Sequence, residues 1–507
     1  MVVALIGVQA AFDLHTSQIL RYEEVAESVR GPLWLAHRTV YDGVSTNLGW
    51  YGLLLAVYHV AGFTIYTAKW VRLVLFAGSL AGLAFVLARV LGRPWRAAVP
   101  LLALGLSPSW LFFNTVQTTY GIDLVVLPYL LALLCVLPVG GGGTLRAAAD
   151  GLARGAFGAL AMVAWMSYPV VVFYLPALAV AYVSRPGRRT PRQEAARSLG
   201  ARLGLPGLGL RTLAPALVGF LLPLAAALAW VRHPAKLLYD PASGSGLFRG
   251  GGTGFVLEPS AVALNVLRTL RDLFVRGSSY YFWLDHAELS GPVGIAAALV
   301  VAAGGALLVR RRRKLRPLLL AAGLVAAADL LVVSAGAGPQ GLRRATALLA
   351  GFYLVFTLVW REATARPARG VVRLASGARL VAVTFCLLLP LHHLAVDALD
   401  WPGLPLAGLE QTHLWLRVEP TARESLTYWL DGTASGRPLD CRDLQLGPER
   451  CQYGGIFALL AGDRRWNHLP PVPLEGWDYA SESFVALTVE RLSGEFDRPA
   501  GDRPRER

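Results

Sequence analysis

Residues 69–96 read KWVRLVLFAGSLAGLAFVLARVLGRPWR, an apolar run that basic residues bound on both sides. The run 69–92 is long enough to cross a bilayer, because about 20 apolar residues in a helix span ~30 Å of hydrocarbon. Its end is marked by Arg89, Arg93 and Arg96, and basic loops stay on the cytoplasmic side of a membrane. The stretch therefore predicts a membrane-spanning helix that ends in the cytoplasm. This orientation fixes which of the other loops are cytoplasmic and which are external.

The composition agrees with a polytopic membrane protein. Hydrophobic residues make up 55% of the chain and charged residues only 16%, whereas soluble domains carry about 25% charged residues. The mean hydropathy is +0.48. The formal net charge of +15 would suit a nucleic-acid partner, but the arginines are concentrated in short loops between apolar runs, where they act as topology signals. We therefore expect membrane lipids, and no nucleic acid, among the partners.

The same reasoning, applied to each apolar run in turn, predicts an all-α protein of about eleven transmembrane helices in the plasma (inner) membrane of a bacterium. Its N-terminus is expected in the cytoplasm and its C-terminal part outside. The first span is the short run MVVALIGVQAAF, and the others are residues 69–92, 97–113, 122–139, 156–166, 170–183, 213–231, 292–309, 317–334, 346–360 and 380–399. The most basic loops, 184–211 and 310–316, are then cytoplasmic.

Two long external loops interrupt the predicted transmembrane domain, which extends over residues 1–399. The first loop, residues 13–68, contains the apolar stretch 49–62. This stretch is too short to cross a bilayer and is expected to lie at the interface as an amphipathic or re-entrant helix. The second loop covers residues 232–291.

The chain changes character after residue 399. Residues 400–492 are polar, with alternating apolar positions such as SFVALTVERL, and predict a small extracytoplasmic α/β domain. Cys441 and Cys451 lie in it, and in an oxidising compartment they are expected to form a disulfide. The tail, residues 493–507, has the composition of a disordered segment.

The first external loop begins with Asp13, directly after the N-terminal apolar run. Charges at a membrane edge are costly and commonly functional. This carboxylate has two candidate roles there, as a general base that deprotonates an acceptor hydroxyl or as a metal ligand. The alternative is a carboxylate that only ends the helix in water. An acidic external loop followed by an interfacial helix suits an enzyme with a lipid-linked sugar donor, because such a lipid keeps its phosphate at the interface and its tail in the bilayer.

Two stretches carry a resemblance to a known family: YEEVAESVRGPLW from residue 22, and STNLGWYGLLLAVYHVAGFTIYTAKWVRLVLFAGSLAGLAFVLARVLGRPWRAAVPLLALGLSPSWLFFNTVQTTYGIDLVV from residue 45. They are similar to the front of the GT-C glycosyltransferases of the dolichyl-phosphate-mannose protein mannosyltransferase and aminoarabinose-lipid A transferase type. The similarity covers residues 10–140, and the remainder resembles the family only in hydropathy and span count. It implies a GT-C-like fold and an inverting transfer of a sugar from a polyprenyl-phosphate donor to a lipid, glycan or protein acceptor outside the cell.

The resemblance also implies which residues of the first loop form the site. The family's acidic pair comes just before an Arg-Tyr-like pair, whereas here Gln18 and Ile19 stand upstream of Arg21 and Tyr22. Asp13 is therefore our first choice for the catalytic base, and Glu23 or Glu24 is the next. The alternative for both glutamates is the solvated face of an amphipathic helix. The residues expected to bind substrate in this loop are His15, Arg21, Tyr22, Glu23 and Glu24.

Three residues outside the first loop complete the expected site. Asp123 matches the family's acidic residue at the second external turn, where it would bind the acceptor or a metal; the alternative is an N-cap of the following span. Arg343 and Arg344 form a basic pair in a predicted external turn, where the positive-inside rule does not expect one. Two guanidinium groups there would suit the phosphate of a lipid donor. Their alternative is an ordinary interfacial anchor. No cofactor is implied, although a divalent metal is compatible with these acids.

Two other positions and two other function classes stay open. Asp329 lies within a predicted span and is expected to be structural, while His392–His393 are weak evidence for a metal site because they are two histidines alone. A transporter or lipid flippase would show inverted repeats and paired buried charges, and the sequence shows no obvious repeat and one buried aspartate. A non-catalytic scaffold whose C-terminal domain binds a partner is the second alternative.

Overall fold

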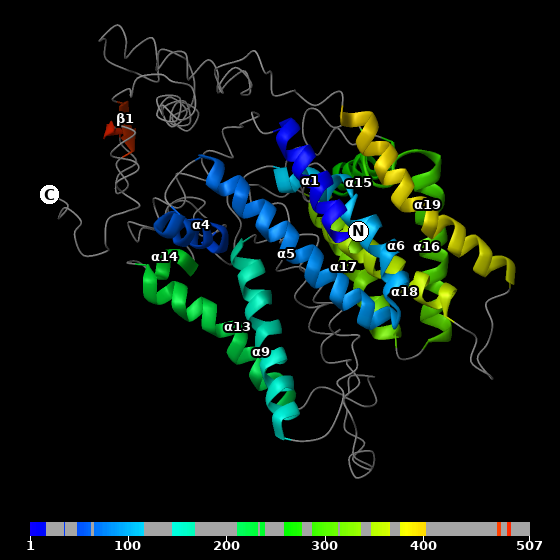
Figure 1. The fold of residues 1–507 in the computed structure, drawn as a ribbon, viewed down its shortest axis with the longest axis horizontal. Helices are drawn as coiled ribbons and strands as arrows, with labels where there is room; N and C mark the ends of the chain where they lie inside the picture. Colours follow the sequence, from blue (N-terminus) through cyan, green and yellow to red (C-terminus); the bar gives the residue numbers. More distant parts are fainter. Residues whose placement is uncertain are drawn as a thin grey trace, which may run out of the picture.

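The computed structural model describes residues 1–16, 35, 48–61, 65–115, 144–167, 210–231, 234–238, 258–275, 286–312, 315–335, 346–365, 376–401, 474–477 and 484–487. These residues form helices almost throughout, arranged as Figure 1 shows. Four of the helices are long and apolar enough to cross a membrane: α5 (Ile65–Leu91), α13 (Leu210–Trp230), α16 (Gly291–Arg311) and α19 (Ser376–Asp400). Each coincides with a predicted span, so the prediction of helices long and apolar enough to cross a membrane is confirmed for these four in the described part of the chain.

Three further helices fall on predicted spans: α9 (Thr144–Ser167), α17 (Arg316–Ala335) and α18 (Thr346–Thr364). The described apolar stretches within α9 and α17, Arg154–Val163 and Ala322–Leu331, are shorter than a full span. Helix α9 begins well before the span predicted at 156–166. The reason is that residues 144–155 are rich in alanine, leucine and arginine, which propagate a helix whether or not it is in a membrane. The predicted spans 122–139 and 170–183 lie outside the described residues.

Helices α16, α17, α18 and α19 pack on one another and form the largest bundle (Figure 1). Its core is apolar, with Leu349, Leu358 and Leu389 fully buried. Glycine brings α16 close to α18, because a Cβ atom added to Gly304 would lie 2.8 Å from a methyl carbon of Val359. Small residues at such positions let helix backbones approach each other in a membrane.

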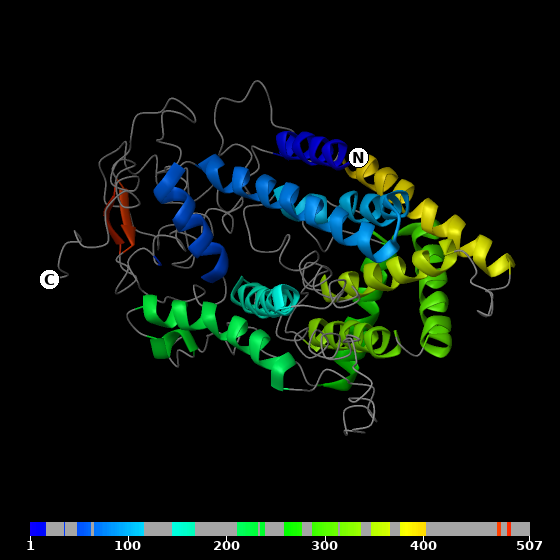
Figure 2. The ribbon, with the colours of Figure 1, turned by 60° about the horizontal axis from the view of Figure 1, so that its bottom comes forward.

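Helices α9 and α13 form a separate tight pair, which Figure 2 shows below α5 and away from α19. A Cβ atom on Gly158 would lie 1.9 Å from the carbonyl oxygen of Ala216, and one on Gly219 would lie 1.9 Å from that of Gly155. These distances are shorter than any van der Waals contact. The two backbones therefore touch, and no side chain fits at either glycine.

The segment predicted as one span at 97–113 is divided into two helices. The chain forms α6 (Pro94–Gly105) and α7 (Pro108–Thr115), with a break at Leu106 and Ser107. Pro108 explains the break, because a proline pushes the residue before it out of the helical region while suiting the first position of a new helix. Ser107 and Ser109 are both fully buried at this point, so the N-terminus of α7 lies inside the protein.

Helix α1 (Val2–Thr16) continues beyond the N-terminal apolar run. Asp13 and His15 therefore occupy its last turn, so the helix extends past the apolar run into the first residues of the predicted external loop. The polar residues after Phe12 are compatible with a helix, because none of them is a proline or glycine.

Helix α4 (Leu48–Ala61) matches the helix predicted at residues 49–62. It contacts α9 and α5 and buries Trp50, Leu54 and Tyr58. The guanidinium carbon of Arg72, on α5, lies 4.3 Å from the centre of the Trp50 ring. A cation–π contact of this kind helps to stabilise an arginine that is fully buried.

The remaining described elements are α14 (Pro234–Leu238), α15 (Pro259–Phe274), β1 (Leu474–Trp477) and β2 (Phe484–Leu487). Helices α14 and α15 belong to the predicted second external loop, 232–291, and α15 packs on α17. Strands β1 and β2 pair antiparallel, with Leu474 opposite Leu487. Of the expected domain 400–492, the described residues are this hairpin and Trp401 with Asp400; Cys441, Cys451 and the tail 493–507 lie outside them.

Candidate functional site

The helix ends that carry basic residues meet at one end of the bundle. Arg96, at the start of α6, donates to the carbonyl oxygen of Thr364 over 2.7 Å, and its own carbonyl accepts a hydrogen bond of 2.7 Å from Nε1 of Trp360. Arg379, at the start of α19, donates to the carbonyl of Ala365. Arg312, directly after α16, forms an ion pair with Glu362. We call this region, defined by the residues Arg96, Arg312, Glu362 and Arg379, the arginine end.

Acidic residues gather at the opposite end, where α1 and α19 finish and α16 begins. The ring of Phe12 in α1 packs edge-on against Trp401, with 5.0 Å between the ring centroids. Asp400 at the end of α19 contacts His286, which precedes α16. We call this region, defined by His286, Glu288, Asp397 and Asp400, the acidic end. Helices α16 and α19 both run between the two ends, in opposite directions.

His286 and Asp400 form a close pair. Oδ1 of Asp400 lies 2.6 Å from Nδ1 of His286, and Oδ2 accepts a hydrogen bond of 3.2 Å from the backbone N–H of the same residue. The carboxylate therefore holds both the ring and the backbone of the histidine. The Asp400 side chain is 4% exposed and the His286 side chain is 37% exposed. A buried carboxylate that orients an exposed imidazole, and leaves Nε2 on the far side of the ring, is an arrangement that suits proton transfer.

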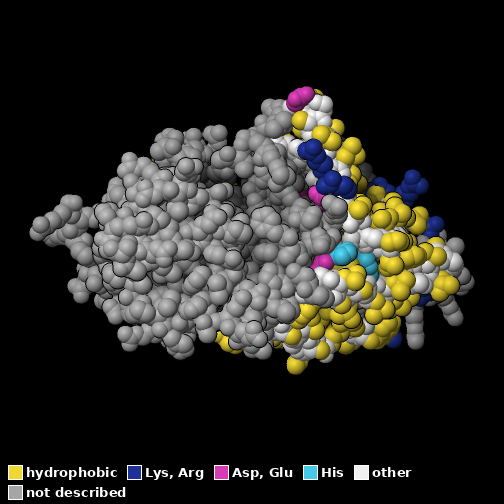
Figure 3. Space-filling view, turned by 90° about the horizontal axis from the view of Figure 1, so that it is seen from above, with side chains coloured by type: hydrophobic (Ala, Val, Ile, Leu, Met, Phe, Trp, Pro, Cys, Tyr) yellow, Lys and Arg dark blue, Asp and Glu magenta, His cyan; other side chains and the backbone are white. Residues whose placement is uncertain are grey.

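Figure 3 looks onto the molecule from above the view of Figure 1. It shows histidine (cyan) and acidic (magenta) side chains side by side at the edge of a surface that is largely hydrophobic. Arginine and lysine side chains (dark blue) lie on neighbouring parts of the same face. Charged groups that can take part in proton transfer are therefore present beside a surface of the kind that faces lipid.

Glu288 holds the break between α6 and α7. Its Oε1 atom accepts hydrogen bonds from the Ser107 hydroxyl, at 2.9 Å, and from the backbone N–H of Ser109, at 2.8 Å. The Glu288 side chain is fully buried. A carboxylate at a helix N-terminus satisfies N–H groups that have no partner inside the helix, and the helix dipole favours its charge. Glu288 is therefore an anchor that joins α7 to the segment before α16.

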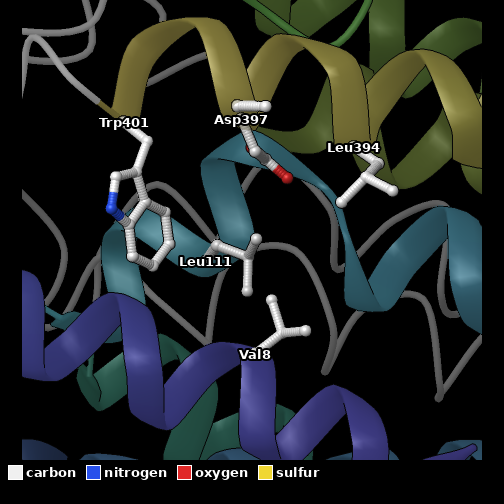
Figure 4. Close-up of a pocket in the computed structure, with 6 residues that line it drawn as sticks. Val8, Leu111, Leu394, Asp397 and Trp401 are labelled. Atoms are coloured by element: carbon white, nitrogen blue, oxygen red, sulfur yellow. The ribbon is translucent and has the colours of Figure 1, made fainter.

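Asp397 lines a cavity of about 250 Å³ between α1, α7 and α19. Figure 4 shows its carboxyl group directed from α19 toward Leu111 and Val8, with the Trp401 ring at one side. Asp397 is 8% exposed, and its Oδ2 atom has no hydrogen-bond partner among the described residues. The other lining residues are Val8, Leu111, Leu394, Ala398 and Trp401.

The wall formed by α1 is fixed to α7 beside this cavity. Gln9 of α1 donates from Nε2 to the carbonyl oxygen of Leu111 over 3.2 Å, and Gln9 is 1% exposed. The contact is side chain to backbone, so it depends on the glutamine amide and not on the identity of Leu111. It fixes α1 against α7 one residue after Val8, which lines the cavity across from Asp397.

His393, the second residue of the predicted histidine pair, has a packing role in this structure. Nδ1 of His393 lies 2.8 Å from the carbonyl oxygen of Ala103 in α6, and the residue is fully buried. Its ring packs edge-on against Tyr353 at a centroid distance of 6.1 Å. No group of three or more histidine, cysteine or acidic side chains in the described part of the chain has the arrangement of a metal site.

The described residues reach only part of the site expected from the sequence. Asp13 and His15 lie in the last turn of α1, next to Phe12 and so close to the acidic end. The other expected residues are outside the described part of the chain: Arg21, Tyr22, Glu23, Glu24, Asp123, Arg343 and Arg344. Asp329 accepts a hydrogen bond of 3.0 Å from the backbone N–H of Leu348, in the first turn of α18. This contact agrees with the structural role expected for it.

Sequence reasoning missed the residues of the acidic end. His393, Asp397 and Asp400 are four and three positions apart, and this spacing places them on one face of a helix. The histidine pair was considered without these carboxylates, although Asp397 follows within a single turn. For His286 and Glu288 the sequence holds a weaker signal, the charged segment LDHAELS directly before an apolar run.

Comparison of the chain with protein-family models, with curated proteins and with solved structures finds no match.

Proposed function

We propose that this chain is a membrane glycosyltransferase that moves a sugar from a polyprenyl-phosphate donor to an acceptor on the extracytoplasmic side. The observation that carries the proposal is the packing of Phe12 against Trp401, at 5.0 Å. This contact brings the end of α1, the helix that holds Asp13, next to Trp401, the residue that follows Asp400. Groups able to accept a proton then gather at one end of the bundle, opposite the arginine end.

The separation of charge between the two ends supports an orientation. Under the positive-inside rule the arginine end faces the cytoplasm, so the acidic end faces outward. The N-terminus of α1 is then cytoplasmic and the segment after Trp401 is extracytoplasmic. This orientation suits a full set of about eleven spans in the plasma membrane, with the sugar transferred outside the cell.

The proposed reaction is a single displacement at the anomeric carbon of the donor sugar. The acceptor hydroxyl oxygen attacks this carbon, and the bond between the carbon and the phosphate oxygen breaks. The electron pair leaves with the polyprenyl phosphate, and the hydroxyl proton passes to a base of the protein. Because attack and departure occur on opposite faces, the configuration inverts.

Asp13 is the first choice for this base and Glu23 or Glu24 the next, and the His286–Asp400 pair is a further candidate that the geometry adds. The carboxylate of Asp400 would stabilise the charged imidazole that forms when His286 accepts a proton. Arg343 and Arg344 are proposed to bind the donor phosphate, where two guanidinium groups would stabilise the charge that develops on departure.

The test of the proposal is direct measurement of transfer by the purified chain in liposomes. Polyprenyl-phosphate donors with different radiolabelled sugars are offered together with short-chain acceptor lipids, and labelled product is counted. The expected result is turnover with at least one donor. The matched control is Glu362→Gln at the arginine end, which should retain that turnover. Absence of turnover with every donor, in protein that is inserted and folded, contradicts the proposal.

A lipid flippase is the second candidate, and Asp397 is the observation that favours it. A carboxylate buried near the end of a candidate span is common along transport paths. The test is the rate at which fluorescent lipids exchange between the leaflets of the same liposomes, without any sugar donor. Exchange faster than in protein-free liposomes, and lost in Asp397→Asn, would favour the flippase.

A further inference from the structure

The cavity at the acidic end combines an apolar wall with one carboxyl group. We infer that it is a binding site for an organic ammonium group carried on a small apolar body. The inference stands on Asp397 and the cavity, and it does not depend on glycosyl transfer.

Asp397 has a buried carboxyl oxygen that a ligand could reach. Its Oδ2 atom is buried and lacks a hydrogen-bond partner among the described residues, and Figure 4 shows the carboxyl group directed into the cavity. A buried polar atom without a partner is costly, and native proteins usually satisfy such atoms. A ligand that donates a hydrogen bond from inside the cavity would satisfy this one.

The charge around Asp397 favours a positively charged hydrogen-bond donor over a neutral one. Asp400 lies three residues after Asp397 on α19, and the buried Glu288 belongs to the same acidic end. Three acidic side chains close together favour a positive ligand over a neutral one, and ammonium hydrogen bonds to a carboxylate are about twice as strong as neutral ones. A metal cation fits less well, because it prefers several oxygen ligands, whereas the other lining side chains are those of Val8, Leu111, Leu394, Ala398 and Trp401.

Size and shape define the body of the ligand. The cavity of about 250 Å³ exceeds the ~150 Å³ of an apolar cavity that accepts benzene. The wall contains the indole ring of Trp401, and an ammonium group near an indole face gains a cation–π attraction. The chemistry is shared by two sources, the amine headgroup of a membrane lipid and an amine that arrives from the aqueous side.

The experiment uses the full chain in nanodiscs of phosphatidylglycerol, which has no amine. Radiolabelled 2-phenylethylammonium and 2-phenylethanol are equilibrated with the protein, and uptake by empty nanodiscs is subtracted. The two probes have the same apolar body and differ in charge. The wild type is expected to bind the ammonium at least about tenfold more tightly than the alcohol, because of the charged hydrogen bond.

Three variants assign the binding. Asp397→Asn should reduce the tenfold preference to about twofold or less, because the amide carries no charge. Asp272→Asn is the matched control, since Asp272 lies on α15 and pairs with Arg271, and it should keep the preference. Ala398→Phe adds a ring beside the cavity while keeping Asp397 itself, and by occupying the space it should abolish binding of both probes. It also serves as the test if Asp397→Asn fails to fold.

Two results overturn the inference: equal affinity for ammonium and alcohol in the wild type, or unchanged affinity in Ala398→Phe. Replacing half of the lipid with phosphatidylethanolamine then distinguishes the sources. Loss of probe binding supports the site and identifies a lipid amine as the occupant. Unchanged binding also supports the site and assigns it to an amine from the aqueous phase.

Discussion

The two ends of the bundle differ in what their charged groups contact. At the arginine end, the guanidinium groups of Arg96 and Arg379 donate to the backbone carbonyls of Thr364, Ala363 and Ala365. These carbonyls lie at the end of α18, where a helix has acceptors without internal partners and where its dipole favours a positive charge. The charges of Arg96 and Arg379 are therefore engaged in holding helices together.

At the acidic end, some charged groups are anchored and others face a cavity or the surface. Glu288 binds Ser107 and Ser109 and so resembles the arginines in role. Asp397 points its Oδ2 atom into a cavity, and His286 is partly exposed. A cluster of charged residues therefore does not by itself indicate a binding site. A charged group that the protein leaves accessible to a solute is the better indication.

The largest expected effect is on transfer, in Asp13→Asn. Removal of a catalytic base typically lowers the rate by about 10²–10⁴-fold, and we expect a loss of that order in this variant. Initial rates in liposomes measure it, with insertion and folding checked by size-exclusion profile. His286→Gln, measured beside it, should cost less than about tenfold if Asp13 is the base. The reverse order of the two losses would transfer the role to the His286–Asp400 pair.

The next effect is on stability, in Glu288→Ala. The substitution leaves the Ser109 N–H and the Ser107 hydroxyl buried without their acceptor, so we expect a loss of about 2–4 kcal/mol in the free energy of unfolding. Thermal unfolding in detergent, followed by helical circular dichroism, measures it. Glu288→Gln keeps an acceptor oxygen and should lose about half as much. Equal losses in the two variants would contradict the anchoring role.

A smaller effect is expected in Arg379→Met at the arginine end. Two carbonyls at the end of α18 lose a charged donor, while the apolar stem is retained, so the expected loss is about 1–2 kcal/mol. Thermal unfolding again measures the change. Transfer and probe binding, measured in the same preparation, should keep their wild-type values at a permissive temperature. A change in either would show that the two ends are coupled.

The smallest effect is expected in Glu362→Gln. The Arg312 side chain is 40% exposed and that of Glu362 is 16% exposed, and pairs with such access to solvent contribute under about 1 kcal/mol. The loss should shrink further as salt is raised, because salt screens the pair. Unfolding curves at low and high salt measure this dependence. A loss above about 2 kcal/mol would place this pair among the buried ones.

Particular residues show how far sequence reasoning reached. The helix at 49–62 and the long apolar runs were predicted with boundaries close to those of α4, α5, α16 and α19. The division at Ser107 was not predicted, although Pro108 is a local signal for it. Asp13 lies in the last turn of α1, because helix propensity continues past the apolar run. Asp397 and Asp400 were missed even though their spacing from His393 is visible in the sequence.

The sequence by itself determined the membrane class, the apolar helices and the grouping of arginines in loops, because hydropathy and charge act within one segment and need no knowledge of its neighbours. Only the tertiary structure decided what the charged residues contact. His286 and Asp400 are 114 positions apart, and Ser107 and Glu288 are 181 positions apart. Their contacts depend on which helix ends pack together. That packing also forms the cavity beside Asp397, which no single segment contains.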